Sequence, residues 1–117
     1  SLVVFQIVQE KLVKMMSGIQ ACLLLGCQVS KRADKNKLSI GQIAMTKAYI
    51  TDRGREITRL GREIMGGNGI LHELHLMRAM MDMEAIYTYE GTYEINTLVA
   101  GREITGLAAF RNSTPKK

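Results

Sequence analysis

Proline is nearly absent from this sequence, since it occurs once, at Pro115, close to the carboxy terminus. Proline inside a helix removes a backbone hydrogen bond, so a chain without internal proline can form long helices. Segments that alternate apolar and polar residues, the pattern of a half-buried strand, are also missing. These two absences predict an all-α fold.

Long apolar runs and cysteine clusters are missing as well. No stretch of about 20 apolar residues occurs, so no membrane span is predicted. Cys22 and Cys27 fit neither a zinc pattern nor a disulfide framework, and two reduced thiols indicate an intracellular protein. His72 and His75 flank Glu73 without HExxH spacing or a third ligand, so no metal site is predicted. The sequence shows neither a secretory signal nor a peroxisomal tripeptide.

Basic residues exceed acidic ones, with 16 Lys and Arg against 11 Asp and Glu, for a net charge of +5. Such an excess can attract nucleic acid, an anionic membrane or a phosphorylated cofactor. The basic residues are dispersed, however, and no aromatic residue is interleaved with their one cluster, which is Lys31, Arg32, Lys35 and Lys37. A solvated connection explains this cluster better than a nucleic-acid site, so no nucleic-acid partner is expected.

The 117 residues, of which 46% are hydrophobic, suffice for one domain with a single core. Apolar residues recur at steps of three and four, which predicts helices at about residues 3–30, 39–65, 71–85 and 92–110. Residues 31–38 connect the first two helices. The predicted architecture is a four-helix up-and-down bundle.

The second predicted helix has the clearest signals. Ser39 and Gln42 form a capping-box pattern at its start. Isoleucine then recurs at heptad spacing, at Ile43, Ile50, Ile57 and Ile64. Small residues that permit close helix approach are Ala44, Ala48, Gly54 and Gly61. We therefore expect this helix to pair antiparallel with the first.

The stretch at residues 86–106 places one carboxylate, Glu90, between an aromatic segment and a glycine. The β-branched and aromatic residues at 87–89 favour an extended segment, and Thr92 can cap the helix that follows. If Tyr87 and Tyr89 partly desolvate Glu90, its basicity rises, as abstraction of a carbon-bound proton requires. The residue pattern alone favours the alternative, a solvated glutamate in a turn.

A second candidate site is the run GGNG at residues 66–69. Glycine and asparagine tolerate the left-handed conformation, so a helix C-cap followed by a turn explains the run. Bare glycines also let a diphosphate approach backbone N–H groups closely. The sequence alone favours the first explanation.

Three motifs together carry a resemblance to a known family. They are TYEGTYEIN at residues 88–96, GGNGI at residues 66–70 and GREITG at residues 101–106. In this order and spacing they resemble the carboxy-terminal helical domain of acyl-CoA dehydrogenases and oxidases, with glutaryl-CoA dehydrogenase and the plant peroxisomal short-chain acyl-CoA oxidases most alike. The resemblance implies a domain at residues 1–110, incomplete at its amino terminus, and a polar tail at residues 111–117.

The resemblance also implies a role for individual residues. Glu90 corresponds to the catalytic base, which removes the α-proton of an acyl-CoA thioester while the β-hydride passes to flavin. Tyr89 and Gly91 correspond to positions beside the base and against the substrate. The residues that correspond to FAD-contacting positions are Glu63, Gly66, Gly67, Thr92 and Glu94.

As partners, the resemblance implies an acyl-CoA substrate, a homo-oligomer (dimer or tetramer), and an electron-transferring flavoprotein if the enzyme is a dehydrogenase rather than an oxidase. It implies a mitochondrial or peroxisomal location. Because the family's amino-terminal and β domains are not in this sequence, whether the chain is an enzyme by itself is left open. The alternatives are a non-catalytic helical module that oligomerises without flavin and a basic nucleic-acid-binding bundle.

Overall fold

A computed structural model describes the backbone of residues 2–108 and the side chains from residue 4 onward; the predicted tail at residues 111–117 lies outside this range. The elements are α1 (Leu2–Asp34), α2 (Ile40–Ile64), the 3₁₀ helices η1 (Gly66–Ile70) and η2 (His72–Leu74), α3 (Leu76–Thr88) and α4 (Tyr93–Thr105). Within residues 2–108 there is no strand. The predicted all-α class with four α-helices is therefore confirmed.

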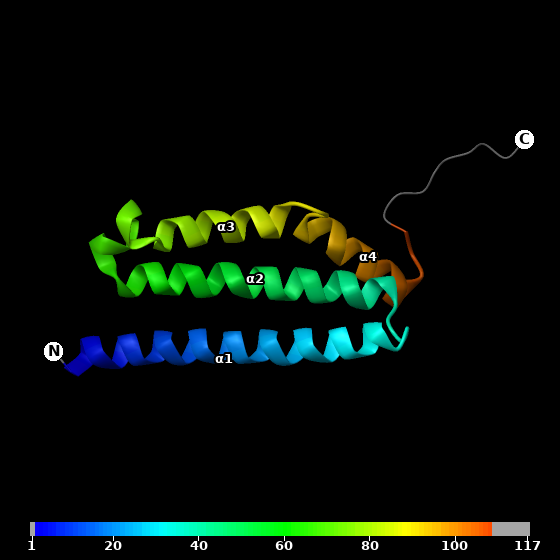
Figure 1. The fold of residues 1–117 in the computed structure, drawn as a ribbon, viewed down its shortest axis with the longest axis horizontal. Coiled ribbons are helices and arrows are strands. Elements are labelled where there is room, and N and C mark those ends of the chain that lie inside the picture. Colours follow the sequence, from blue (N-terminus) through cyan, green and yellow to red (C-terminus); the bar gives the residue numbers. More distant parts are fainter. Residues whose placement is uncertain (1, 109–117) are drawn as a thin grey trace, which may run out of the picture.

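Helix α2 lies in the middle of the fold (Figure 1). The antiparallel helix α1, which is about 50 Å long at 1.5 Å per residue, packs along one side of it. Helices α3 and α4 follow one another along the other side, and α4 ends near the start of α2. The helices thus form three layers, with α3 and α4 sharing one layer.

Small residues on α2 set the spacing of these layers. A Cβ added at Gly54 would lie 2.1 Å from the terminal methyl of Met83, so α3 approaches closely there. A Cβ at Gly61 would contact both Met15 of α1 and Leu76 of α3. The expected close approach to α1 is present at Gly61, whereas Gly54 admits α3 instead. The buried hydrophobic residues are correspondingly small, apart from one leucine: Ala44, Ala48, Leu60 and Ala100.

Both predicted helix caps are present. The Ser39 hydroxyl accepts a hydrogen bond from the Gln42 N–H, and the Gln42 side chain accepts one from the Ser39 N–H. These two bonds complete the capping box of α2. At the start of α4 the Thr92 hydroxyl accepts a hydrogen bond from the Ile95 N–H at 3.2 Å.

Four predicted helix boundaries were wrong. Helix α4 ends at Thr105 rather than at about residue 110, because Gly106 takes the left-handed conformation, with φ of 74°. Helix α1 continues to Asp34, and its last turn carries Lys31 and Arg32, whose charges favour a helix carboxy terminus. Helix α3 begins at Leu76 rather than residue 71, because η2 and the left-handed His75, with φ of 61°, precede it. Tyr87 and Thr88 are helical rather than extended, and the chain becomes extended only at Tyr89.

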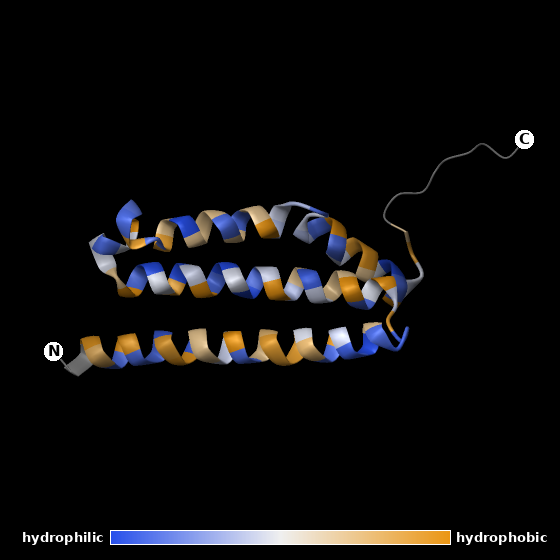
Figure 2. Ribbon diagram, in the orientation of Figure 1, coloured by the Kyte–Doolittle hydropathy of each residue, from blue (hydrophilic) through white to orange (hydrophobic). Residues whose placement is uncertain are grey.

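Helix α1 carries many apolar residues, mixed with hydrophilic ones that gather toward its carboxy-terminal end (Figure 2). Residues Val4–Asp34 include an 18-residue window with mean hydropathy of 1.5, enough by length and composition for a membrane span. This is weak evidence, because core helices of globular proteins meet the same two criteria. Much of the apolar surface of α1 is exposed in this chain, including Leu12, Met16 and Leu23.

Candidate functional site

The loop that joins α3 to α4 has an unusual backbone. Tyr89 is extended, whereas Glu90 and Gly91 both have positive φ, at 54° and 93°. Residues other than glycine seldom adopt this left-handed conformation, which is found preferentially where the surrounding structure imposes it, often at functional sites. The predicted catalytic residue therefore sits at the most constrained point of the loop.

Lys47 of α2 contacts the backbone of this loop from outside. Its Nζ donates hydrogen bonds to the carbonyl oxygens of three successive residues, at 3.2 Å for Glu90, at 2.6 Å for Gly91 and also to Tyr89. The same Nζ lies 5.6 Å from the centroid of the Tyr89 ring, within cation–π range. The contact of Lys47 with this loop was not predicted from the sequence. In the structure, Lys47 lies between the buried residues Thr46 and Ala48.

Helix α4 holds the loop from the other end. The side-chain amide of Asn96 donates to the carbonyl oxygens of Gly91, at 2.8 Å, and Thr92, at 3.0 Å. The Gly91 carbonyl therefore accepts from Lys47 and Asn96 together. A Cβ at Gly91 would lie 3.2 Å from the Asn96 amide nitrogen, so glycine suits this position both sterically and conformationally.

Tyr87 and Tyr93, one on each side of the loop, pack against each other. The rings of Tyr87 and Tyr93 stack with centroids 5.2 Å apart, and the guanidinium of Arg55 lies 4.1 Å from the Tyr87 ring centroid. Arg55 also donates to Glu84 at 2.7 Å, which raises the pKa of Arg55. Desolvation, reinforced by the charge of Glu94, raises the pKa of the Tyr87 hydroxyl.

The expected desolvation of Glu90 is not provided by the described residues. The Glu90 side chain is exposed, and Tyr89 is 56% exposed. Tyr87 stacks on Tyr93 and Tyr89 lies near Lys47, so neither ring covers the carboxylate. Glu94, in the first turn of α4, is exposed as well. This surface is open to a ligand or to another part of a larger protein.

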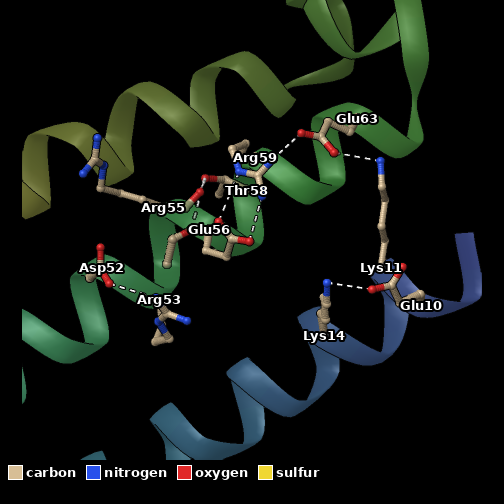
Figure 3. A network of polar contacts seen from close by, with 11 residues as sticks. Glu10, Lys11, Lys14, Asp52, Arg53, Arg55, Glu56, Thr58, Arg59 and Glu63 are labelled. Carbon is tan, nitrogen blue, oxygen red and sulfur yellow. Dashed lines mark hydrogen bonds and ion pairs between the residues drawn. The ribbon is translucent and has the colours of Figure 1, made fainter. Parts of the chain in front are cut away.

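The predicted contact residue Glu63 belongs to an ion-pair network near the other end of α2 (Figure 3). Lys11 of α1 reaches across to donate to one carboxylate oxygen at 2.7 Å, and Arg59 donates to the other. The hydrogen bond from Lys11, together with the charge of Arg59, holds the pKa of Glu63 below its ordinary range. Both oxygens are therefore occupied by cations of this chain.

The glycine run after α2 forms the predicted helix end and turn. Gly66 has φ of 57°, and a Cβ added at Gly66 or Gly67 would meet nothing within 4 Å. Their backbone is therefore open to a ligand, which fits the predicted dinucleotide contact. Gly69 has a packing role instead, because a Cβ there would lie 2.4 Å from the Arg62 carbonyl oxygen.

The structure brings only part of the predicted site together. Tyr89, Glu90, Gly91, Thr92 and Glu94 lie in one loop and the first turn of α4. Glu63 is four turns further along α2 than Lys47, about 24 Å at 1.5 Å per residue. The glycine run lies beyond it. A single copy therefore presents two separate surfaces, one around Glu90 and one at the carboxy-terminal end of α2.

The described residues contain no group of three or more His, Cys, Asp or Glu side chains placed to hold a metal ion. His72 and His75 are exposed in the turn around η2.

Comparison with known proteins gives a consistent result. Residues 1–105 match the family described as acyl-CoA dehydrogenase, C-terminal domain. The 2-methylacyl-CoA dehydrogenase of Solanum tuberosum is 29% identical over 100 residues, which cover 86% of this chain and 24% of that protein. The crystal structure of glutaryl-CoA dehydrogenase from Mycobacterium smegmatis matches with a TM-score of 0.83 and 34% identity, over 88% of this chain and 27% of the other.

A second structure of a Mycobacterium smegmatis glutaryl-CoA dehydrogenase, in complex with FADH2, matches with a TM-score of 0.85 and 34% identity. The match covers 91% of this chain and 28% of the other. The present chain thus spans about a quarter of the length of the relatives it matches.

Proposed function

This chain belongs to the acyl-CoA dehydrogenase family, as its carboxy-terminal domain, and on that premise we propose that it supplies the catalytic base for FAD-dependent α,β-dehydrogenation of an acyl-CoA thioester. Glu90 is that base. The observation that carries the proposal is the fixed, solvent-facing position of Glu90 in a left-handed loop held by Lys47 and Asn96. A base must reach the substrate proton in a defined geometry, and this loop supports that requirement.

Proton abstraction is the step assigned to this chain's own residues. The Glu90 carboxylate takes the α-proton, which is acidic because the neighbouring thioester carbonyl spreads the developing charge. The backbone N–H of Glu90 is a candidate donor to that carbonyl oxygen. Tyr89 and Gly91 line the approach to the base. The desolvation that raises the basicity of a carboxylate would come from bound substrate and from parts of the protein outside residues 2–108.

The cofactor of the proposed reaction is FAD, which accepts a hydride when bound. Thr92 and Glu94 would contact it beside the base, and Gly66 and Gly67 would offer bare backbone to the dinucleotide. The open space around the two glycines supports this assignment. The FADH2 complex of the mycobacterial relative supports the same cofactor. Glu63 fits less well, because Lys11 and Arg59 already occupy both carboxylate oxygens.

The remaining partners follow from the same proposal. The substrate is an acyl-CoA, and the protein is a homo-oligomer, dimer or tetramer, in which exposed apolar side chains of α1 become covered. A dehydrogenase would pass electrons to an electron-transferring flavoprotein, whereas an oxidase would pass them to oxygen. The potato relative's name supports a mitochondrial location, and a peroxisomal one stays an alternative.

The paired state of Glu63 favours a second candidate function. A dinucleotide contact there would have to share the carboxylate with Lys11 and Arg59 or displace one of them. A non-catalytic helical module that oligomerises without flavin has no such requirement. The two candidates differ in one measurable property, which is flavin bound to the purified protein.

The Glu90→Gln variant of the flavoenzyme containing this domain tests the proposed base. The amide keeps the size of the side chain but cannot accept the α-proton, so we expect flavin content to be retained and reduction by acyl-CoA to fall by at least about 10³-fold. Stopped-flow absorbance of the flavin measures both. Glu73→Gln, an exposed glutamate of η2, is the control. Normal reduction in Glu90→Gln would refute the assignment, and a flavin-free wild type would favour the non-catalytic module.

A further inference from the structure

We infer that Lys47 is a positioning residue, which fixes the catalytic carboxylate of Glu90 by holding the main chain beneath it. The inference rests on the proposed function of Glu90. It concerns a residue on a different helix, 43 positions away in sequence, whose bonds go to the loop's backbone.

The geometry of the contact carries the inference. A lysine ammonium has three N–H donors and no acceptor. Here it meets three carbonyl oxygens from three consecutive residues, at 3.2 Å for Glu90, at 2.6 Å for Gly91 and also from Tyr89. In an extended chain successive carbonyls point to opposite sides, so they converge here because Glu90 and Gly91 have positive φ. The convergence and the left-handed backbone are therefore two aspects of one arrangement.

This backbone determines where the base lies. The φ and ψ angles of Glu90 set the direction of its Cα–Cβ bond, and hence the region that its carboxylate can reach. If the loop relaxed to negative φ, the carboxylate would move even though no side chain of the site had changed. Because the bonds of Lys47 go to carbonyl oxygens, the Glu90 carboxylate itself remains available to take a proton.

Lys47 projects from a well-packed segment of α2, which suits a positioning role. Lys47 lies in the part of α2 with the most buried residues, which include Ala44, Thr46, Ala48 and Thr51. This segment packs against α4, whereas the loop itself is largely exposed. Lys47 thus ties an exposed loop to the most buried segment of the fold. Asn96 supplies a second restraint, from α4, on the carbonyl oxygens of Gly91 and Thr92.

The Lys47→Met variant tests the inference in the flavoenzyme containing this domain. Methionine keeps length and helix propensity but removes all three donors. We expect the rate of flavin reduction at saturating acyl-CoA to fall about 10- to 100-fold, because small misplacements of a catalytic group have effects of this size. The dissociation constant for acyl-CoA should change less than about 3-fold, and flavin content should not change. Lys31→Met, which removes an exposed lysine of α1, is the matched control.

A second readout in the 117-residue chain separates the inference from the proposed function. In Lys47→Met the backbone order parameters of Glu90 and Gly91 should fall from about 0.85, typical of rigid backbone, to below about 0.6. If acyl-CoA does not reduce the flavin of the wild type but Lys47→Met still loses backbone order, the proposed function is refuted. The restraint of the loop by Lys47 is then still supported. An active wild type matched by Lys47→Met within about 2-fold would overturn the inference. If Lys47→Met does not fold, Lys47→Arg replaces it, because no single nitrogen of a planar guanidinium can donate to three carbonyl oxygens at once. A loss of at least about 3-fold in its saturating rate supports the inference, and a wild-type rate overturns it.

Discussion

Gly91 shows how closely the candidate site depends on single residues. Its φ is 93°, and an added Cβ would lie 3.2 Å from the Asn96 amide nitrogen. We predict that Gly91→Ala lowers the free energy of unfolding by about 1–2 kcal/mol, since an L-residue is strained in this conformation. Chemical denaturation measures the change. The control is Gly101→Ala, in α4, where a Cβ meets nothing within 4 Å and should stabilise the helix by about 0.5–1 kcal/mol. Equal effects at both positions would contradict the prediction.

Residue-level prediction succeeded where the determinants are local in sequence. Ser39 with Gln42 and Thr92 with Ile95 interact across three residues, so a short pattern identifies them as caps. Lys47 and its carbonyl partners are 42 to 44 residues apart, and no local pattern encodes that contact. The exposure of Glu90 agrees with the solvated glutamate that the residue pattern alone favours. Its desolvation by Tyr87 is not observed, because the orientation of Tyr87 depends on Tyr93 and Arg55, which no local pattern encodes.

At the scale of elements, the Lys11–Glu63 pair joins α1 to α2 and makes their association sensitive to pH. Glu63 has an ordinary pKa of 4.5 that is lowered in the folded chain. Its contribution to stability is therefore present above about pH 4.5 and is lost as pH falls through the lower folded-state pKa. We predict that Glu63→Gln lowers the melting temperature at pH 7 and that this difference shrinks as the pH falls below about 4.5. Thermal unfolding at low salt tests this, because salt screens exposed pairs. If the difference in melting temperature between wild type and Glu63→Gln did not change with pH, the pH sensitivity assigned to the Lys11–Glu63 pair would be contradicted.

For α2, both helix boundaries were predicted well because residues at each end of the helix stop it locally. The capping box fixes the start of α2 and Gly66 its end, so the predicted 39–65 and the observed Ile40–Ile64 agree. Tyr87 and Thr88 have low helix propensity but remain helical, because stacking on Tyr93 and contact with Arg55 outweigh that preference. The late start of α3 follows from the left-handed His75, which sequence pattern gives no reason to expect.

At the scale of the whole molecule, the apolar stripe of α1 at Leu12, Met16, Ile19 and Leu23 predicts self-association. Met16 and Leu23 are 65% and 59% exposed, which is costly in water for side chains of this size. We predict that the 117-residue chain sediments above its monomer mass and that Met16→Lys with Leu23→Lys shifts it toward the monomer. Ser17→Lys with Gln28→Lys adds the same charge at exposed polar positions of α1 away from this stripe and should leave association unchanged. A monomeric wild type would contradict the prediction.

Helix α2 separates the fold into two halves that share little besides α2 itself. Helix α1 packs mainly on one face of α2, while α3 and α4 pack on the other (Figure 1). Such halves can open as separate cooperative units with different free energies. The restraints on the Glu90 loop come from Lys47 of α2 and Asn96 of α4, so we expect fraying or rebinding of α1 to leave them intact. The proposed assembly through α1 and the proposed chemistry at Glu90 therefore depend on different packing faces of α2.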